Sequence, residues 1–201
     1  MNIAGLLISF GLLLVAMSIH EFSHGWVAYK LGDTTAKYQG RLTLNPLAHI
    51  DPFGTIILPI IMFLTIGFAI GSAKPVPINY WALKNPKRDM IWIGMAGPLS
   101  NIITAVIFSQ IVKFLPSATV LSEILRSFVF LNVLLGIFNL IPIPPLDGSR
   151  ILTGFLPSEI SKYYLSLEPF GFIIIVILIP LGFFNRIMPI VNRIMEILGI
   201  M

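Results

Sequence analysis

The sequence predicts an all-helical (all-α) integral membrane protein, a polytopic helical bundle of about four to six membrane segments with a small membrane-associated β hairpin. Its 201 residues are 56% hydrophobic and only 11% charged, with a mean hydropathy of +0.92. A soluble domain usually carries about a quarter charged residues, so a soluble globular enzyme is excluded. Several uncharged stretches reach the roughly 20 residues that a helix needs to cross a bilayer. They lie at 1–19, 52–73, 90–112, 127–146 and 169–185.

Cysteine is absent from the sequence, which excludes a disulfide framework, a thiolate metal cluster and a cysteine nucleophile. Any bound metal must therefore be held by His, Asp, Glu or Asn side chains. The net charge of +4 lies beside the apolar stretches, where positive loops indicate the cytoplasmic face of a membrane protein. We therefore expect no nucleic-acid partner.

Residues 3–29 form the first predicted helix, which ends at the Gly32 turn signal. A basic n-region and a small-residue cleavage site are missing, so we interpret it as a retained membrane helix rather than a secretory signal. Beyond it, polar and apolar side chains alternate from Lys37 to Leu44, and the pattern closes at Asn45. A period of two is typical of a strand, so we expect a short strand or hairpin here.

Three apolar segments follow in the middle of the chain. Residues 54–71 are apolar but contain Pro59 and Gly67, whereas 90–113 and 123–141 are clean spans. The small residues within 90–113 allow helix backbones to approach closely in lipid, so association into homo-oligomers is permitted.

The C-terminal third begins with a proline-broken stretch, 142–145, which cannot continue an α-helix. A short helix is expected to restart at Asp147 or Gly148. The remaining segments are a polar connector at 157–168, an apolar span at 169–184 and an interfacial helix at 185–201. We expect one membrane-embedded domain over 1–201, with a core at 3–155 and the C-terminal span and interfacial helix at 169–201.

Residues 20–24 read His-Glu-Phe-Ser-His, which is an HExxH motif. The imidazoles of His20 and His24 lie about a turn apart on one helix face, where both can bind one Zn²⁺ while the adjacent carboxylate reaches a metal-bound water. Ionisable groups at membrane depth are costly, so this cluster needs mutual or metal compensation. The alternative is a polar helix end near the lipid headgroups, since Lys30 follows closely.

A catalytic zinc usually has three protein ligands and one open position, so a third ligand is needed. Asp147 is the strongest candidate, because it ends a long uncharged segment after the proline-broken stretch. Irregular backbone at membrane depth is tolerated only where it lines a cavity or is buried in protein. Asp147 could also cap the helix that follows, a role that is compatible with metal binding. His49 is the weaker alternative, because a loop histidine beside a proline turn is more often structural.

Three ordered motifs run through the chain: HExxH at 20–24, Gly97-Pro98-Leu99-Ser100-Asn101, and Asn139-x-x-Pro142-x-x-Pro145-Leu146-Asp147-Gly148. Together they resemble the site-2 proteases of peptidase family M50, which are intramembrane zinc metalloproteases. The resemblance extends over 10–155.

The resemblance implies one zinc ion per chain, with His20, His24 and Asp147 as ligands and Glu21 as the general base. It also implies that residues 35–44 form the membrane-associated β element of the family. Many members carry a PDZ or CBS domain, and we expect this chain to be a minimal form without either.

The direction of the spans constrains the topology. The histidines lie toward the C-terminal end of the first span, and Asp147 follows the C-terminal end of the span at 123–141. These two spans must run in the same direction if the three side chains are to meet. Complete crossings by both 54–71 and 90–113 would make them antiparallel, so one segment must fail to cross.

The loops on both sides of 54–71 are basic, and positive charge favours the cytoplasmic face. We therefore predict that 54–71 is re-entrant, turning near Pro59 or Gly67, and that the active site faces the cytoplasmic side. In a rival arrangement, 54–71 spans the membrane and 142–147 runs back into it. A prokaryotic cell membrane is the expected location, inferred from the family resemblance.

These residues predict a hydrolytic enzyme, and the resemblance implies that it hydrolyses peptide bonds in or near transmembrane segments. Glu21 would accept a proton from zinc-bound water, and a side-chain amide would stabilise the oxyanion. Asn139 is favoured over Asn101 for this role because it belongs to the same broken segment as Asp147; for either, a helix-to-helix hydrogen bond is the alternative. An extended substrate would pair with the edge of the Lys37–Leu44 strand, for which a simple surface hairpin is the alternative.

Two other classes of function remain open at this stage. A pseudoprotease or chaperone that binds membrane helices would not require Glu21. A metal-ion transporter would need several acidic groups along a continuous path, and the sequence offers too few. We therefore expect a zinc metalloendopeptidase that acts on a transmembrane protein substrate within the lipid bilayer.

Overall fold

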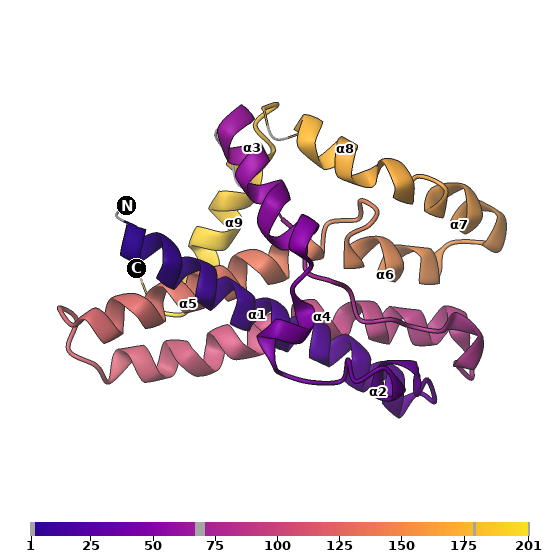
Figure 1. Ribbon diagram of the computed structural model, residues 1–201, viewed down its shortest axis with the longest axis horizontal. Helices are drawn as coiled ribbons and strands as arrows, with labels where there is room; N and C mark the ends of the chain where they lie inside the picture. Colours follow the sequence, from indigo (N-terminus) through magenta and orange to yellow (C-terminus); the bar gives the residue numbers. More distant parts are fainter. Residues whose placement is uncertain (1–2, 67–70, 179, 201) are drawn as a thin grey trace.

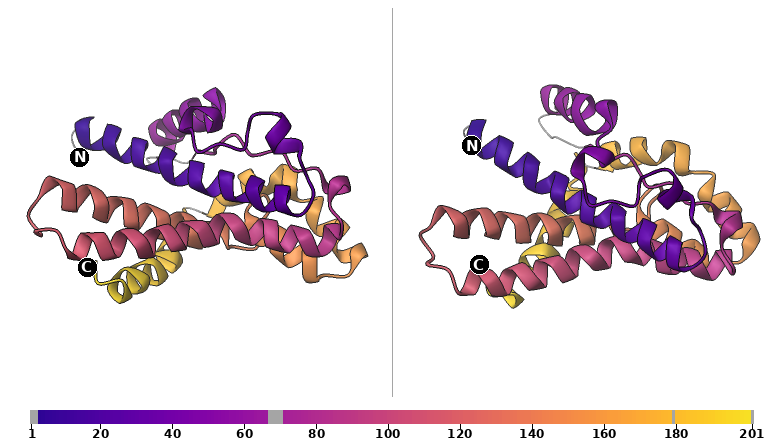
Figure 2. Two further views of the ribbon diagram at one scale, coloured as in Figure 1. Left: turned by 90° about the horizontal axis from the view of Figure 1, so that it is seen from below. Right: turned by 60° about the horizontal axis from the view of Figure 1, so that its bottom comes forward.

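Three long helices form the centre of the fold: α1 (Ile3–Lys30), α4 (Pro86–Lys113) and α5 (Val120–Asn139). α4 and α5 form a hairpin, and α1 packs against both of its helices (Figures 1 and 2). Each of the three contains a predicted span, so the central helices lie where the sequence predicts them.

The computed structural model describes residues 3–66, 71–178 and 180–200. Within them, three helices are long and apolar enough to cross a membrane. A fourth span is added if α7 (Ser158–Leu165) and α8 (Glu168–Leu178), which are bent by 62° at their junction, act as one. The described residues thus support an all-helical membrane protein with three or four spans, fewer than the upper part of the predicted range.

Close packing of α4 against α5 depends on a glycine. A Cβ atom at Gly136 of α5 would lie 3.1 Å from the carbonyl oxygen of Pro98 on α4. Small residues let helix backbones approach closely in lipid, where burial of apolar surface does not drive helices together.

α1 and α5 run in the same direction. The C-terminal half of α1 lies against the N-terminal half of α4, where Ala28 and Ile93 are buried in one apolar cluster. Because α5 returns antiparallel to α4, the C-terminal ends of α1 and α5 lie at the same end of the bundle (Figure 2). The first of these ends carries the two histidines, and the second leads to Asp147. This satisfies the condition that the predicted site imposes on the topology.

The segment between α1 and α4 doubles back. Its helical part consists of η2 (Pro52–Ile57) and α3 (Leu58–Ile66). The Ser72 amide then donates to the Gly54 carbonyl at 2.9 Å, and the Thr55 hydroxyl donates to the Ser72 carbonyl at 2.8 Å. The two ends of 54–71 therefore meet, as predicted for a re-entrant element. The turn is not at Pro59, which continues the helix, and Gly67 lies outside the described residues.

The predicted β hairpin is wrong, because the described residues contain no strand there. Residues Thr35–Tyr38 form the short helix α2, and a 3₁₀ turn, η1, follows at Pro46–His49. The Asp33 carboxylate accepts a hydrogen bond from the Thr35 amide at 2.9 Å, which favours a helical start over an extended chain. Gly40 then turns the chain with φ of +65°, so the alternation from Lys37 to Leu44 never becomes a strand.

An extended segment, 71–79, runs back along α1 instead. The Arg41 guanidinium donates to the Lys74 carbonyl at 2.6 Å, and the Asn79 amide donates to the Asp33 carboxylate at 2.6 Å. A short 3₁₀ turn, η3 (Tyr80–Ala82), then leads toward α4. Side chains from the preceding loop therefore hold this segment in place without strand pairing.

The C-terminal part wraps the end of the bundle where α5 ends. α6 (Asp147–Phe155) begins after the proline-broken stretch, as predicted, and packs on α4. The expected connector is instead largely the helix α7, and α9 (Phe183–Ile197) closes the chain.

The apolar face of α9 packs against the bundle. Its Ile187, Val191 and Met195 are buried together with Val129 and Val133 of α5. The apolar face that predicted an interfacial helix therefore packs largely against the protein itself. Where α9 lies relative to a membrane stays a prediction.

The doubled-back course of 54–71 predicts which loops share a side of the membrane. Cysteines introduced at Tyr38 and Trp81, whose side chains are 85% and 87% exposed, should react with a membrane-impermeant thiol reagent from the same side. A cysteine at Phe114, 89% exposed at the far end of α4, should react from the opposite side. The native chain has no cysteine, so each signal comes from one position. Labelling of positions 38 and 81 from opposite sides would show that 54–71 crosses.

Candidate metal centre

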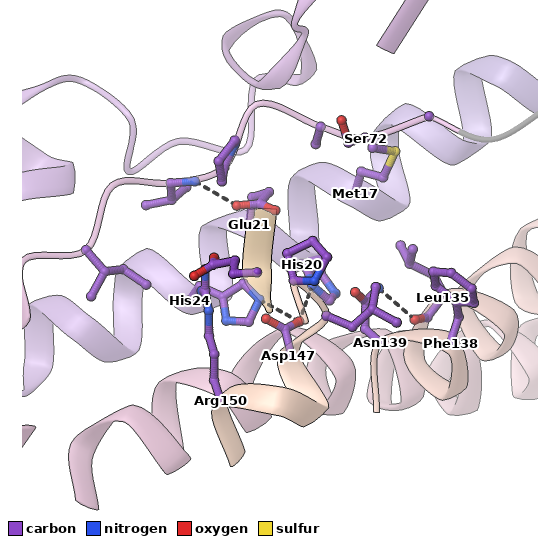
Figure 3. A pocket seen from close by; sticks show the side chains of 18 residues that line it. Met17, His20, Glu21, His24, Ser72, Leu135, Phe138, Asn139, Asp147 and Arg150 are labelled. Atoms are coloured by element: carbon purple, nitrogen blue, oxygen red, sulfur yellow. Dashed lines mark hydrogen bonds and ion pairs between the residues drawn. The ribbon is translucent and has the colours of Figure 1, made fainter. Parts of the chain in front are cut away.

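The structure brings the three predicted metal ligands into contact. His20 and His24 project from one face of α1, and Asp147 is the first residue of α6 (Figure 3). Asp147 Oδ2 lies 2.9 Å from His20 Nε2 and 3.1 Å from His24 Nε2. All three residues are buried, with relative exposures of 5%, 3% and 6%. Two helices far apart in the sequence, α1 and α6, thus supply one compact group of possible metal-ligand atoms.

The far side of each imidazole is held by an oxygen atom. His24 Nδ1 lies 2.6 Å from the carbonyl oxygen of Ile93 on α4, which can only accept a hydrogen bond. His20 Nδ1 lies 2.6 Å from the side-chain oxygen of Asn101, also on α4. The Asn101 amide nitrogen donates to the Ala16 carbonyl at 3.1 Å and to the Asn132 side-chain oxygen at 2.9 Å, and the two bonds together direct its oxygen toward His20. Both rings therefore donate through Nδ1.

This arrangement fits a metal ion. In a neutral imidazole that donates through Nδ1, Nε2 carries a lone pair. When both imidazoles are neutral, the two Nε2 atoms and Asp147 Oδ2 are three hydrogen-bond acceptors, with each Nε2 within 3.1 Å of Oδ2, a contact that requires either a proton or a cation between them. A cation held by all three removes this conflict, and two imidazoles with a carboxylate suit zinc and leave one position open.

Gly97 of α4 leaves the space in front of the two histidines. A Cβ atom there would lie 2.3 Å from His24 Nε2 and 2.5 Å from His20 Nε2. Gly148 is needed for a similar reason, because its Cβ would lie 2.2 Å from the Leu140 carbonyl oxygen. Helix packing alone was the reason expected for the small residues of 90–113, so the role of Gly97 at the metal centre was missed from the sequence.

The metal centre opens into a cavity of about 380 Å³. Its walls include the three predicted ligands, Glu21, Asn139 and the extended segment from Gly71 to Ile78. The Val76 amide donates to Glu21 Oε2 at 2.8 Å, which holds the carboxylate at the wall of the cavity. The predicted general base thus lies beside the predicted ligands, with its second oxygen not engaged by this bond.

The two asparagines that were candidates for the oxyanion lie in different places. Asn139 lines the cavity and donates through its amide to the Leu135 carbonyl at 3.0 Å. Asn101 is fully buried behind His20 and does not line the cavity. His49 lies outside the metal centre and donates to the Thr43 carbonyl at 2.8 Å.

Sequence reasoning also missed Arg150, which points from α6 toward the cavity (Figure 3). It follows Asp147 by three residues, so helix periodicity places both side chains on one face. The spacing of three residues from Asp147 could therefore have indicated that Arg150 lies near the site. The Val76 amide, by contrast, has no sequence signal, because its role depends on the path of 71–79.

Comparison with known proteins supports the same class of enzyme. The family model described as "Peptidase family M50" matches residues 117–179. The Bacillus subtilis protein named "Putative zinc metalloprotease YwhC" is 40% identical over 181 residues, which cover 85% of this chain and 80% of that protein. No solved structure matches at a comparable level of significance.

Two more distant relatives carry similar names. "Putative zinc metalloprotease Rip2" of Mycobacterium tuberculosis is 28% identical over 167 residues, 82% of this chain and 63% of that protein. A protein of Methanocaldococcus jannaschii named as a zinc metalloprotease is 31% identical over 150 residues, 75% of this chain and 34% of that protein.

The matching family and the names of the relatives place the chain among the zinc metalloproteases, and the buried His20, His24 and Asp147 group lies inside its bundle of membrane-length helices. The chain belongs to peptidase family M50, the family of the site-2 proteases. The resemblance read from the three motifs is confirmed, and the expected zinc metalloprotease is confirmed at the level of the family.

The space at Gly97 leads to a testable expectation. Gly97→Ala should lower zinc retention by about tenfold or more after mild chelator washing, because the new methyl group occupies the position in front of both Nε2 atoms. Helix propensity acts in the opposite direction, since alanine favours a helix over glycine by about 1 kcal/mol. Gly11→Ala, on α1 with nothing within 4 Å, is the matched control and should retain zinc. Full zinc retention in Gly97→Ala would contradict this geometry.

Proposed function

We propose that the protein is an intramembrane zinc metalloprotease that hydrolyses peptide bonds in or near transmembrane segments of membrane proteins. The observation that carries the proposal is the close approach of His20 Nε2, His24 Nε2 and Asp147 Oδ2, beside the Glu21 carboxylate, inside a bundle of membrane-length helices. The whole chain from 1 to 201 would act as one membrane-embedded domain.

His20, His24 and Asp147 would hold the zinc ion. When bound, zinc supplies an activated water and polarises the scissile carbonyl. Glu21 accepts the proton through the oxygen that does not bond the Val76 amide, and later delivers a proton to the leaving amine. Asn139, at the cavity wall, offers an amide hydrogen to the oxyanion.

The bilayer is the environment that the outer surface of the helices fits. Large apolar side chains are exposed on the membrane-length helices, among them Leu7 (62%) on α1 and Ile107 (54%) on α4. Basic residues gather at the end of the bundle toward which the histidines of α1 lie. They are Lys30, Lys84 in the loop before α4, and Lys87 and Arg88 in the first turn of α4. Positive charge favours the cytoplasmic face, so the active site would open toward the cytoplasm.

A helical substrate must be unwound before hydrolysis, because its carbonyl groups are engaged in hydrogen bonds. The segment expected from the sequence to hold it open, Lys37–Leu44, is not a strand. The cavity is instead walled by the extended residues 71–78 and by the proline-broken stretch before α6. Substrates with helix-breaking residues near the cleavage site therefore suit this cavity.

Glu21→Gln separates a protease from a protein that only binds membrane helices. The variant should keep its zinc and lose about 100-fold or more in the rate of cleavage, because the amide cannot accept the proton. The measurement uses purified protein in vesicles with a model transmembrane substrate that contains a helix-breaking residue. Glu159→Gln, in an exposed ion pair with Lys162, is the control and should cut normally.

Equal cleavage by wild type and Glu21→Gln would reject the role of this carboxylate. Zinc-loaded wild type that binds the model substrate and leaves it intact would favour the non-proteolytic, helix-binding role.

A further inference from the structure

Two buried asparagines connect all three central helices to the metal centre. Asn101 on α4 and Asn132 on α5 are both completely inaccessible to solvent. The Asn101 amide nitrogen donates to the Asn132 side-chain oxygen at 2.9 Å, and the Asn132 amide nitrogen donates to the Phe128 carbonyl at 2.9 Å. The chain of bonds ends at His20, whose Nδ1 faces the Asn101 oxygen.

The direction of every bond in this chain is fixed by backbone carbonyls. The Phe128 carbonyl can only accept, so the Asn132 amide nitrogen faces it and the Asn132 oxygen faces Asn101. Asn101 then directs one amide hydrogen to the Ala16 carbonyl of α1 and the other to Asn132 of α5. With both hydrogens engaged, the Asn101 oxygen must face His20.

We infer that Asn132 is a positioning residue of the metal centre. Through Asn101 it holds the His20 ring as the tautomer with hydrogen on Nδ1, so that the Nε2 lone pair faces Asp147. Asn132 touches neither His20 nor the cavity among its described contacts, so it acts only through Asn101. The inference rests on the ligand role of His20 in the proposed function.

A purely structural role is the competing explanation, because side-chain amides also join helices in membranes. The second histidine separates the two explanations. His24 is held by the Ile93 backbone carbonyl on α4, a contact that does not involve Asn132. General loosening of the bundle would disturb both histidines, whereas loss of positioning would disturb His20 alone.

The test reads the ring nitrogens of zinc-free protein by NMR after labelling with ¹⁵N-histidine. The chain has three histidines, so substituting each one by Gln in turn assigns the signals. In wild type, His20 and His24 should both show hydrogen on Nδ1. In Asn132→Leu, the fraction of His20 that carries hydrogen on Nδ1 should fall while His24 remains unchanged, because Asn101 loses one of the two acceptors that orient its amide. Zinc affinity, measured by chelator competition, should fall about tenfold, because outer partners of this kind orient a ligand histidine.

Val133→Ala is the matched control for packing. Val133 follows Asn132 on α5 and is fully buried in the apolar cluster between α4, α5 and α9. Its truncation should lower thermal stability and leave the His20 tautomer and zinc affinity at their wild-type values. Asn132→Asp, which as a neutral acid keeps an acceptor for Asn101 and a donor for Phe128, should restore the tautomer.

An unchanged His20 tautomer in Asn132→Leu would overturn the inference, as would equal changes in His20 and His24 or the same changes in Val133→Ala. Asn132→Ala gives the same test if the leucine variant does not fold. Because the NMR readout needs neither zinc nor substrate, a failure to detect proteolysis would not alter what the tautomers show about Asn132.

Discussion

The contact of His20 and His24 with Asp147 is the interaction on which the rest of the structure depends. His20 Nε2 and His24 Nε2 both meet Asp147 Oδ2, while the opposite face of each ring donates to an oxygen atom of α4. In an apolar bundle such a group is unfavourable without a positive charge, because buried polar atoms need partners. A cation bound by all three atoms would neutralise this cost and connect α1 to α6. The glycine at position 97 keeps the necessary space open.

The same contact explains the course of the chain. Since the histidines precede the end of α1 and Asp147 follows the end of α5, these helices must point the same way. The doubled-back segment 54–71 provides this, because its two ends are bonded to each other before α4 begins. Its return also places residues 71–79 along the cavity, where the Val76 amide holds Glu21. One topological solution thus positions both the proposed metal ligands and the proposed general base.

Much of this could be predicted from the sequence, because long apolar segments and HExxH spacing are local signals. The positions of the central helices followed from them to within about four residues at each end. Asp147 was predicted as a partner of His20 and His24 because it follows the proline-broken stretch, and the three side chains lie in contact. The alternation from Lys37 to Leu44 led to the wrong prediction of a strand. The turn at Gly40 and the hydrogen bond from the Thr35 amide to the Asp33 side chain determine the backbone conformation there. Asp33 is itself held by the Asn79 amide, which is 46 residues away in the sequence. A local sequence pattern carries no information about a hydrogen-bond partner at that distance.

The roles of the asparagines could not be predicted for the same reason. Asn101 belonged to a recognised motif, yet only the packing of α1 against α4 shows that its oxygen faces His20 and not the cavity. Asn132 gave no signal at all, because a single amide in an apolar span is equally consistent with a bond to its own helix. Partners of this kind depend on the register between helices, which is set by the whole fold.

The most direct test of the account is the zinc content of detergent-purified protein after mild chelator washing, compared between wild type and Asp147→Ala. The account predicts about one zinc ion per wild-type chain, lost in Asp147→Ala and retained in the exposed control Glu159→Ala. Equal zinc retention in wild type and Asp147→Ala would contradict it, because the carboxylate that joins α6 to the two histidines would then not be a metal ligand.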